Sequence, residues 1–555
     1  MITGQSLDAV IISSYGFMDT LHLTTEGAFV GFELHLDNQL ADFDFLRSYF
    51  RNNRDLELTR SQWDARPPKD KMPTYLSGVY LSSFLRKQMN LNVRTINSFV
   101  HEQDRLDEYL KQSPPFVIVS TTLIVMSDHL EKITRYVRER SPETKIILGG
   151  LKLYKSYKIK QSSDNGEIPD FSRESLAKYH YFMGPKTDEA DYYIINTRGE
   201  HTLLRLLKAL GNGEDVSGME NLAYYTEAGT WQINPVVDEP NYLKDWCIDW
   251  ESVEEEIIGG EFPVSFKQGC PYSCSFCEFT ALDRDLSARS LDLVIDEIKR
   301  AKDRFDLKNI YFVDENLFFN KKQLREFCER LDKEQLGLRW RAQTRVTYLD
   351  PDTSAMLKES GCFQLALGIE SGDDTVLKNM NKKSTAEQNY IAVCDAQRAG
   401  IDVYATFVVG FPGETEETFQ NTVDMIKRFP TDNGGFVFYH AFPFLLTPLC
   451  PASTQDFRKT HGLTGGQNRW QHPTMTFGQA TDLVLDMFLT VDNASHRYLN
   501  STEATTLRNN IPQHRTILQA RQKLAQGRVR GASESEEAPL WDVMEQAYQE
   551  LEDRN

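Results

Sequence analysis

The stretch Gly269-Cys270-Pro271-Tyr272-Ser273-Cys274-Ser275-Phe276-Cys277 holds three of the eight cysteines of this chain, and the first 246 residues hold none. The spacing is Cys-x3-Cys-x2-Cys. Three thiolates on one short loop can ligate three irons of a [4Fe–4S] cubane and leave the fourth iron open. Tetrahedral zinc normally needs a fourth protein ligand, and no matching Cys or His pair lies nearby. The spacing therefore predicts that Cys270, Cys274 and Cys277 are the metal ligands of an iron–sulfur cluster; a zinc loop or chance occurrence are the alternatives.

The charge balance narrows the possible partners. The 555 residues include 62 Lys and Arg against 81 Asp and Glu, a net charge of −19. An acidic chain repels a phosphate backbone, so we expect no nucleic-acid partner. No apolar run approaches the ~20 residues of a membrane-spanning helix, and no basic segment opens the chain as in a secretory signal. We expect a cytoplasmic protein of about three domains that binds no membrane.

The region after position 260 is predicted to be an α/β barrel. Apolar runs alternate with amphipathic helical segments, and six strands are expected at 264–269, 309–313, 338–344, 363–368, 402–409 and 435–441. Six repeated β-then-α units predict a partial (β/α)6 barrel over 261–450. The cysteine loop comes directly after the first strand of this barrel. The remaining 451–555 read as a mainly helical region, with a linker at 526–539.

The region before position 210 is predicted to be a second α/β domain. Buried strands at 115–120, 144–148 and 191–195 alternate with helical segments, which favours a Rossmann-like parallel sheet over 73–210. Ligands of such sheets bind beyond the carboxyl ends of the strands. We expect 1–72 to be an N-terminal extension carrying a first strand, and 211–260 to be a connector. A polar stretch at 155–187 is expected to be an insertion.

The motif Cys270-x3-Cys274-x-Phe276-Cys277 resembles the signature of the radical S-adenosylmethionine (SAM) enzymes. The preceding region resembles the cobalamin-binding domain of the cobalamin-dependent branch, which includes many methyltransferases. The resemblance covers roughly 75–445. It implies three cofactors, namely a 4Fe-4S cluster, S-adenosyl-L-methionine and cobalamin, and it implies that Phe276 lies near the adenine of SAM.

The resemblance also assigns SAM-binding residues at strand ends. In Asp314-Glu315-Asn316, Glu315 is expected to hold the SAM amino group, because a carboxylate pairs with an ammonium. Arg345 is expected at the SAM carboxylate, and Glu370, followed by Ser371, at the ribose hydroxyls. Gly410 opens a Gly-Phe-Pro-Gly-Glu-Thr turn that is expected near the adenine.

For cobalamin the resemblance implies residues after three strands. They are Thr121, Thr122 and Leu123, then Gly149 and Gly150, then Gly199 and Glu200. Small residues at these ends would let a corrin tail pass beside the sheet. The Asp-x-His-x-x-Gly motif, whose histidine ligates cobalt in free cobalamin carriers, is absent from the sequence. Either cobalamin binds without a histidine ligand, or the domain holds no cofactor.

These features together predict a cobalamin-dependent radical SAM methyltransferase. The expected substrate is an unactivated carbon, or a phosphinate phosphorus, of a small natural-product precursor, and the expected partner is a one-electron reductant such as flavodoxin or ferredoxin. The alternatives are a radical SAM enzyme that catalyses a cyclisation, rearrangement or oxidation, and, from another class, a cobalamin or iron–sulfur sensor.

Overall fold

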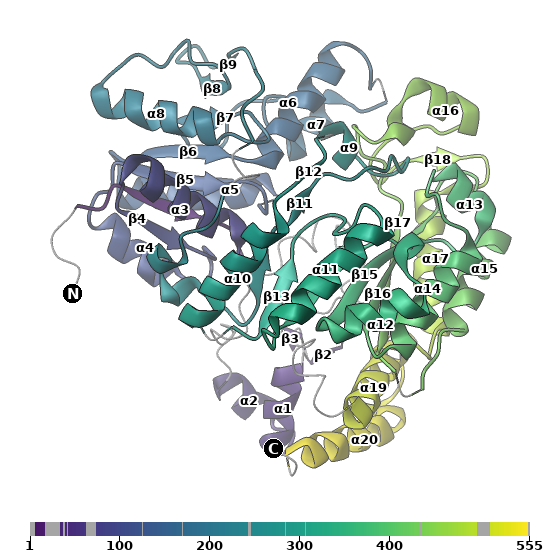
Figure 1. Cartoon of the computed structure of the whole chain (residues 1–555). Helices are drawn as coiled ribbons and strands as arrows, with labels where there is room; N and C mark the ends of the chain where they lie inside the picture. Colours follow the sequence, from purple (N-terminus) through teal and green to yellow (C-terminus); the bar gives the residue numbers. More distant parts are fainter. Residues whose placement is uncertain are drawn as a thin grey trace.

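The computed structural model describes residues 6–16, 34–36, 39–40, 43–62, 74–124, 126–168, 170–241, 246–282, 285–305, 307–432, 434–496 and 511–552. Two seven-stranded sheets organise them, each with helices beside it (Figure 1). None of the described helices is long and apolar enough to cross a membrane. The α/β class predicted from the alternating pattern is confirmed.

The first sheet has the strand order β4-β1-β5-β6-β7-β8-β9. The pairs from β4 to β7 are parallel, and β8 and β9 add an antiparallel edge. Its strands are β1 (Ala9–Ile12), β4 (Val93–Ile96), β5 (Phe116–Ser120), β6 (Lys145–Gly149), β7 (Tyr192–Ile194), β8 (Leu222–Tyr225) and β9 (Trp231–Ile233). Its helices are α3 (Leu76–Met89), α4 (Gln103–Leu110), α5 (Ser127–Arg140), α6 (Leu151–Asp164), α7 (Arg173–Tyr179) and α8 (Glu200–Asn212). The central strands β1, β5 and β6 are mainly apolar, as is typical of a parallel sheet whose two faces are covered by helices.

The second sheet has the order β10-β13-β14-β15-β16-β17-β20, and every pair in it is parallel. Its strands are β10 (Phe262–Val264), β13 (Asn309–Phe312), β14 (Arg339–Thr344), β15 (Cys362–Glu370), β16 (Asp402–Val409), β17 (Val437–Pro443) and β20 (Ser495–His496). The intervening helices are α10 (Leu291–Phe305), α11 (Lys321–Glu334), α12 (Pro351–Glu359), α13 (Asp374–Asn379), α14 (Ala386–Arg398) and α15 (Glu416–Lys427). This is the predicted partial barrel of six β/α units, extended by one short strand.

The helices of the barrel start at polar caps directly after the strands or turns that precede them. Asp350, Thr385 and Thr415 each form a capping box with the residue three positions on. Such caps satisfy backbone N–H groups that have no partner inside the helix. Each cap fixes the turn that leads into its helix, and the turns before α12 and α15 carry the predicted site residues Arg345 and Gly410.

Four predictions about elements are corrected. The first barrel strand ends at Val264, and residues 267–268 instead form β11, a short antiparallel partner of β12 (Ser287–Ala288). The polar stretch at 155–187, expected to be an insertion, contains most of α6 and all of α7. α6 buries Leu153 and Ile159 behind a polar outer face, which resembles a loop in the sequence. The connector at 211–260 contains β8 and β9, which continue the first sheet.

The fourth corrected prediction is the linker expected in the C-terminal region. Its helices are α16 (Gln455–His461), α17 (Phe477–Thr490), α19 (Ile511–Val529) and α20 (Glu534–Glu552), so only a few residues separate α19 from α20, where a linker over 526–539 was expected. The region also supplies β20 to the barrel and a hairpin of β18 (Gln471–His472) and β19 (Met475–Thr476). At the bottom of Figure 1, α20 packs near α1 (Phe43–Arg51), beside α2 (Leu56–Gln62).

Candidate functional site

The cysteine loop leaves the barrel immediately after β11. Gly269 precedes Cys270 at φ +83°, where an added Cβ would lie 2.4 Å from the carbonyl oxygen of Asp285. Only glycine adopts this backbone without strain. Cys274 is buried, and the backbone N–H of Cys277 donates to its carbonyl oxygen at 3.1 Å, which closes a turn between the two ligands.

Two segments distant in sequence hold this loop. The N–H of Ser275 donates to the carbonyl of Met380 (2.8 Å), and the amide of Asn381 donates to the carbonyl of Ser273 (2.8 Å). The N–H of Ala452 donates to the carbonyl of Ser275 (2.8 Å). Both neighbours of Cys274 are therefore fixed by backbone or amide bonds, so the loop is preorganised rather than free.

The three thiols lie in a weakly solvated environment. Burial raises the pKa of Cys277 to about 11 and also raises the pKa of Cys270. At neutral pH the thiols of Cys270 and Cys277 are protonated until a metal displaces the protons. Among the described residues no group of three or more His, Cys, Asp or Glu side chains is placed to hold a single metal ion. Ligation of a cubane does not require such a common point, because each thiolate binds a different iron.

Arg345 lies directly against the loop. Its Nη1 is 3.6 Å from the Cys274 sulfur, its guanidinium carbon is 3.7 Å from the centre of the Tyr272 ring, and its Nη2 donates to the carbonyl of Lys382. The residue is 8% exposed. A fixed positive charge beside the cysteines suits an anionic ligand, as expected for a residue assigned to a carboxylate.

Glu370 ends β15 and faces the same region. It adopts φ +66°, unusual for a residue other than glycine, and its Oε1 accepts from the ammonium of Lys382 at 2.8 Å. Lys382 Nζ also lies 5.7 Å from the ring centre of Phe276. Both charges of the pair are almost fully buried, and removal of either partner would leave the other charge buried without compensation. Strained backbone at a strand end is a feature of ligand sites.

Ser371 and Gly410 serve local turns. The Ser371 hydroxyl accepts from the N–H of Asp373 at 3.1 Å. Gly410 has φ +84°, and an added Cβ would lie 2.7 Å from the Trp470 ring. Its N–H donates to the carboxylate of Glu414, whose pKa burial raises to about 8. These contacts shape the turns, while ligand contacts of the two residues stay a prediction.

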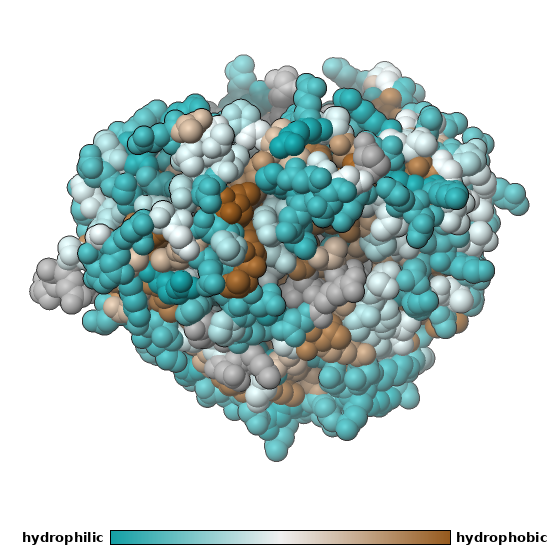
Figure 2. Space-filling view, turned by 90° about the horizontal axis from the view of Figure 1, so that it is seen from above, coloured by the Kyte–Doolittle hydropathy of each residue, from teal (hydrophilic) through white to brown (hydrophobic). Residues whose placement is uncertain are grey.

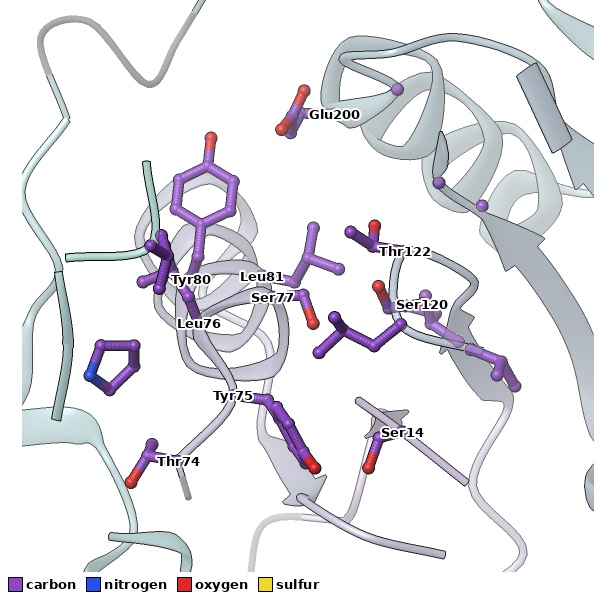
Figure 3. A pocket seen from close by; sticks show the side chains of 18 of the residues that line it. Ser14, Thr74, Tyr75, Leu76, Ser77, Tyr80, Leu81, Ser120, Thr122 and Glu200 are labelled. Carbon is purple, nitrogen blue, oxygen red and sulfur yellow. The ribbon is translucent and has the colours of Figure 1, made fainter. Parts of the chain in front are cut away.

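A cavity of about 700 Å³ lies between the two sheets. Its walls come from the carboxyl ends of the first sheet, from α3 and from the first three barrel strands. Figure 3 shows Ser77, Tyr80 and Leu81 of α3 on one side. Ser120 at the end of β5, Thr122 just after it and Glu200 at the start of α8 lie opposite. Seen from above, hydrophobic side chains gather near the centre of the molecule among hydrophilic ones (Figure 2).

Most of the predicted residues of the first domain reach this cavity. The lining includes Thr122, Leu123, Gly149, Gly150, Gly199 and Glu200. Thr121 stands behind it, with its hydroxyl and N–H both donating to the carbonyl of Gly149. Burial raises the pKa of Glu200 to about 7.

Two glycines keep the cavity open. Gly150 has φ +125°, and an added Cβ would lie 3.0 Å from the Thr121 hydroxyl and from the N–H of Thr122. At Gly199 an added Cβ would lie 2.6 Å from a methyl of Ile194. The Ser77 hydroxyl, which faces the cavity, has no hydrogen-bond partner among the described residues. The cavity therefore combines space with a polar group that a ligand can satisfy.

The barrel contributes lining residues that the sequence did not single out. Arg341 makes a bidentate ion pair with Glu261 (2.5 and 2.6 Å), and its guanidinium stacks 3.9 Å from the Tyr311 ring centre. Glu315, expected at the SAM amino group, lies in the same wall. Strand alternation would have found Arg341 and Tyr311, because both point inward from adjacent parallel strands. The neighbouring Asp314 instead accepts from the N–H groups of Phe266 (3.0 Å) and Lys267 (2.6 Å) and fixes the start of the cysteine loop.

A known protein family matches the barrel region of this chain. The family model "Radical SAM superfamily" matches residues 264–426, which begin at the last residue of β10 and include the cysteine loop. Residues 264–426 of this chain form a radical SAM domain. This domain thus corresponds to the barrel described above, and the recognition made from the cysteine motif is confirmed.

Curated proteins similar to this chain include enzymes of two reaction types. It is 26% identical over 381 residues to the anaerobic magnesium-protoporphyrin IX monomethyl ester cyclase of Rubrivivax gelatinosus, covering 66% of this chain and 64% of the relative. It is 34% identical over 171 residues to the bacteriochlorophyllide d C-12(1)-methyltransferase of Chlorobaculum tepidum, covering 30% and 37%. The chain thus spans less than two thirds of the length of these relatives.

The fold extends the similarity to the first domain. The radical SAM methyltransferase TsrM of Kitasatospora setae, solved with cobalamin and a [4Fe-4S] cluster bound, superposes with a TM-score of 0.57 at 14% identity, covering 98% of this chain and 100% of that one. The predicted pairing of a Rossmann-like sheet with a partial radical SAM barrel is therefore confirmed as a fold.

Proposed function

We propose that this chain is a cobalamin-dependent radical SAM methyltransferase of a small molecule. The observation that carries the proposal is the shared cavity, in which the carboxyl ends of the first sheet face the barrel strands next to the cysteine loop. In this proposal 73–210 form the cobalamin-binding domain and 261–450 form the radical SAM barrel, and the protein acts in the cytoplasm.

The residues present fit the three groups. The thiols of Cys270, Cys274 and Cys277 would hold a 4Fe-4S cluster, and the buried Arg345 beside Cys274 suits the carboxylate of S-adenosyl-L-methionine. The backbone of Gly150 and Gly199, which carries no side chain at the cavity wall, and the unsatisfied Ser77 hydroxyl suit a large ligand with amide groups. When bound, the cluster and SAM supply one-electron cleavage of a sulfonium, and cobalamin supplies a methyl carrier.

The side chains of the protein position the bound groups and exclude water from the cavity. The Glu370–Lys382 pair and Arg345 place fixed charges around one face of the cysteine loop, and these charges cost little reorganisation because they are already desolvated. The apolar part of the cavity wall, with Leu76, Leu81 and Leu123, excludes water from the reacting groups. Such a site favours radical chemistry on an unreactive carbon.

A second candidate is a reaction without methyl transfer, such as a cyclisation. It is supported by the similarity to the R. gelatinosus cyclase, which covers more of this chain than the similarity to the C. tepidum methyltransferase does. The methyltransferase reaction is preferred because TsrM, a structure similar over 98% of this chain, is a methyltransferase. The substrate is proposed to be a small molecule, with carbon or phosphinate phosphorus as the methyl acceptor.

Anaerobic reconstitution tests the proposal. Protein treated with iron, sulfide and hydroxocobalamin should retain, after desalting, the absorption of a 4Fe-4S cluster and of a corrinoid, and should cleave SAM. Cys274→Ala should lose the cluster and SAM cleavage, whereas Cys328→Ala, a buried cysteine of α11 outside the loop, should retain both. Zinc in place of iron in the wild-type protein would contradict the proposal. Methylated product formed from SAM, as opposed to 5′-deoxyadenosine alone, separates the two candidate reactions.

A further inference from the structure

A second pocket lies on the barrel at α13 and the start of α14. It measures about 380 Å³ and shares no lining residue with that cavity. Its wall is formed by α13, by the start of α14 and by the turn between them, with Lys378, Lys382 and Lys383 among its residues. The function proposed above assigns nothing to it.

This pocket backs directly onto the cysteine loop. The turn that forms its wall donates through Asn381 to the carbonyl of Ser273 and accepts through Met380 from the N–H of Ser275. Ser273 and Ser275 are the two neighbours of Cys274. Only the thickness of one chain segment therefore separates the pocket from a cluster ligand, and electron transfer is favoured by short distances.

The charge exposed at the pocket is positive. Lys382 is paired with Glu370, and the carboxylate of Asp374, which accepts from the N–H of Ala386 at 2.7 Å, keeps its negative charge. The two remaining lysines outnumber that one carboxylate in the pocket wall. Lys378 and Lys383 are exposed, and among the described residues neither ammonium has a carboxylate within ion-pair distance. Two exposed lysines that lack an ion pair in the described part of the chain give this pocket a local attraction for an acidic partner on a chain whose net charge is −19.

We propose that this pocket is the docking site of an acidic electron-transfer protein that reduces the cluster. The inference rests on the proposed function, since it needs a cluster on the loop. Carboxylates of the donor contact Lys378 and Lys383, and one electron leaves the donor and enters the cluster, with no bond broken and no proton transferred. The donor docks outside the cavity, so the substrate site stays accessible during reduction.

The test compares two electron donors of opposite charge with the reconstituted holoenzyme. Reduction of the cluster is followed by stopped-flow absorbance, with a reduced flavodoxin of net negative charge and with reduced methyl viologen, a small cation. In Lys378→Glu/Lys383→Glu the rate constant with flavodoxin should fall about tenfold or more at low salt, as expected for lost electrostatic steering. The rate constant with methyl viologen should not fall.

Matched controls separate docking from general charge. Lys322→Glu/Lys333→Glu places the same charge change on exposed lysines of α11 and should leave the flavodoxin rate within about twofold. In the wild-type protein the flavodoxin rate should decrease with ionic strength more steeply than in Lys378→Glu/Lys383→Glu. An unchanged flavodoxin rate in that variant, equal loss in the α11 variant, or equal loss with methyl viologen would overturn the docking site. A preparation without any cluster would instead overturn the proposed function, and its spectrum reveals this before donors are compared.

Discussion

Replacing Gly150 by alanine should weaken both the fold and corrinoid binding. Gly150 has φ +125° and ψ −176°, a region that residues other than glycine essentially avoid, and the new Cβ would lie 3.0 Å from three atoms of Thr121 and Thr122. Backbone strain of this kind costs about 1–3 kcal/mol. Relief of the strain requires movement of the turn after β5, which is a wall of the cavity.

The expected magnitude follows from that cost. A strain of about 1–3 kcal/mol that is present only when the corrinoid is bound lowers the corrinoid affinity roughly 5- to 150-fold, since 1.4 kcal/mol corresponds to a factor of ten. The assay is titration of apoprotein with hydroxocobalamin, followed by visible absorbance, together with urea unfolding of the same variant.

Gly531→Ala provides the control. Gly531 also has a positive φ (+76°), but an added Cβ would meet nothing within 4 Å, and the residue lies between α19 and α20, outside the cavity lining. This variant should lose about 1 kcal/mol of stability and keep its corrinoid affinity. Equal corrinoid affinity in Gly150→Ala and the wild-type protein would refute the reasoning that this turn shapes the cavity.

Two further predictions concern buried charges of the barrel. Lys382→Met leaves Glu370 buried without its cation and should cost about 3–5 kcal/mol in urea unfolding, with partial recovery in Lys382→Met/Glu370→Gln; a loss below about 1 kcal/mol would show that the pair is solvated. The pKa of Glu414 is raised to about 8, so the folded state binds the proton more tightly than the unfolded state does, and the free energy of unfolding should fall as pH rises from about 4.5 to 8. Glu414→Gln should flatten this dependence in unfolding titrations at several pH values, whereas an unchanged slope would assign it to another group.

The sequence alone predicted the cluster ligands from the cysteine spacing and most of the barrel strands from their apolar runs. Three cysteines within eight residues are local, so their chemistry is readable without knowing the fold. The barrel strands from β13 to β17 were located to within two residues of their observed bounds, because buried parallel strands are continuous apolar runs. Amphipathic or edge elements, such as α6, β8 and β9, were missed since their polar faces resemble loops.

Only the tertiary structure decided which groups meet. Arg341, Glu261 and Tyr311 line the same cavity as Gly150 and Glu200, although up to about 190 positions separate them in sequence. The fastening of Ser273 and Ser275 by Asn381 and Met380, and hence the pocket behind Cys274, likewise depends on strands pairing across the barrel. A sequence records local periodicity and spacing, whereas a site built between two sheets depends on how their strand ends are brought face to face, which no local pattern encodes.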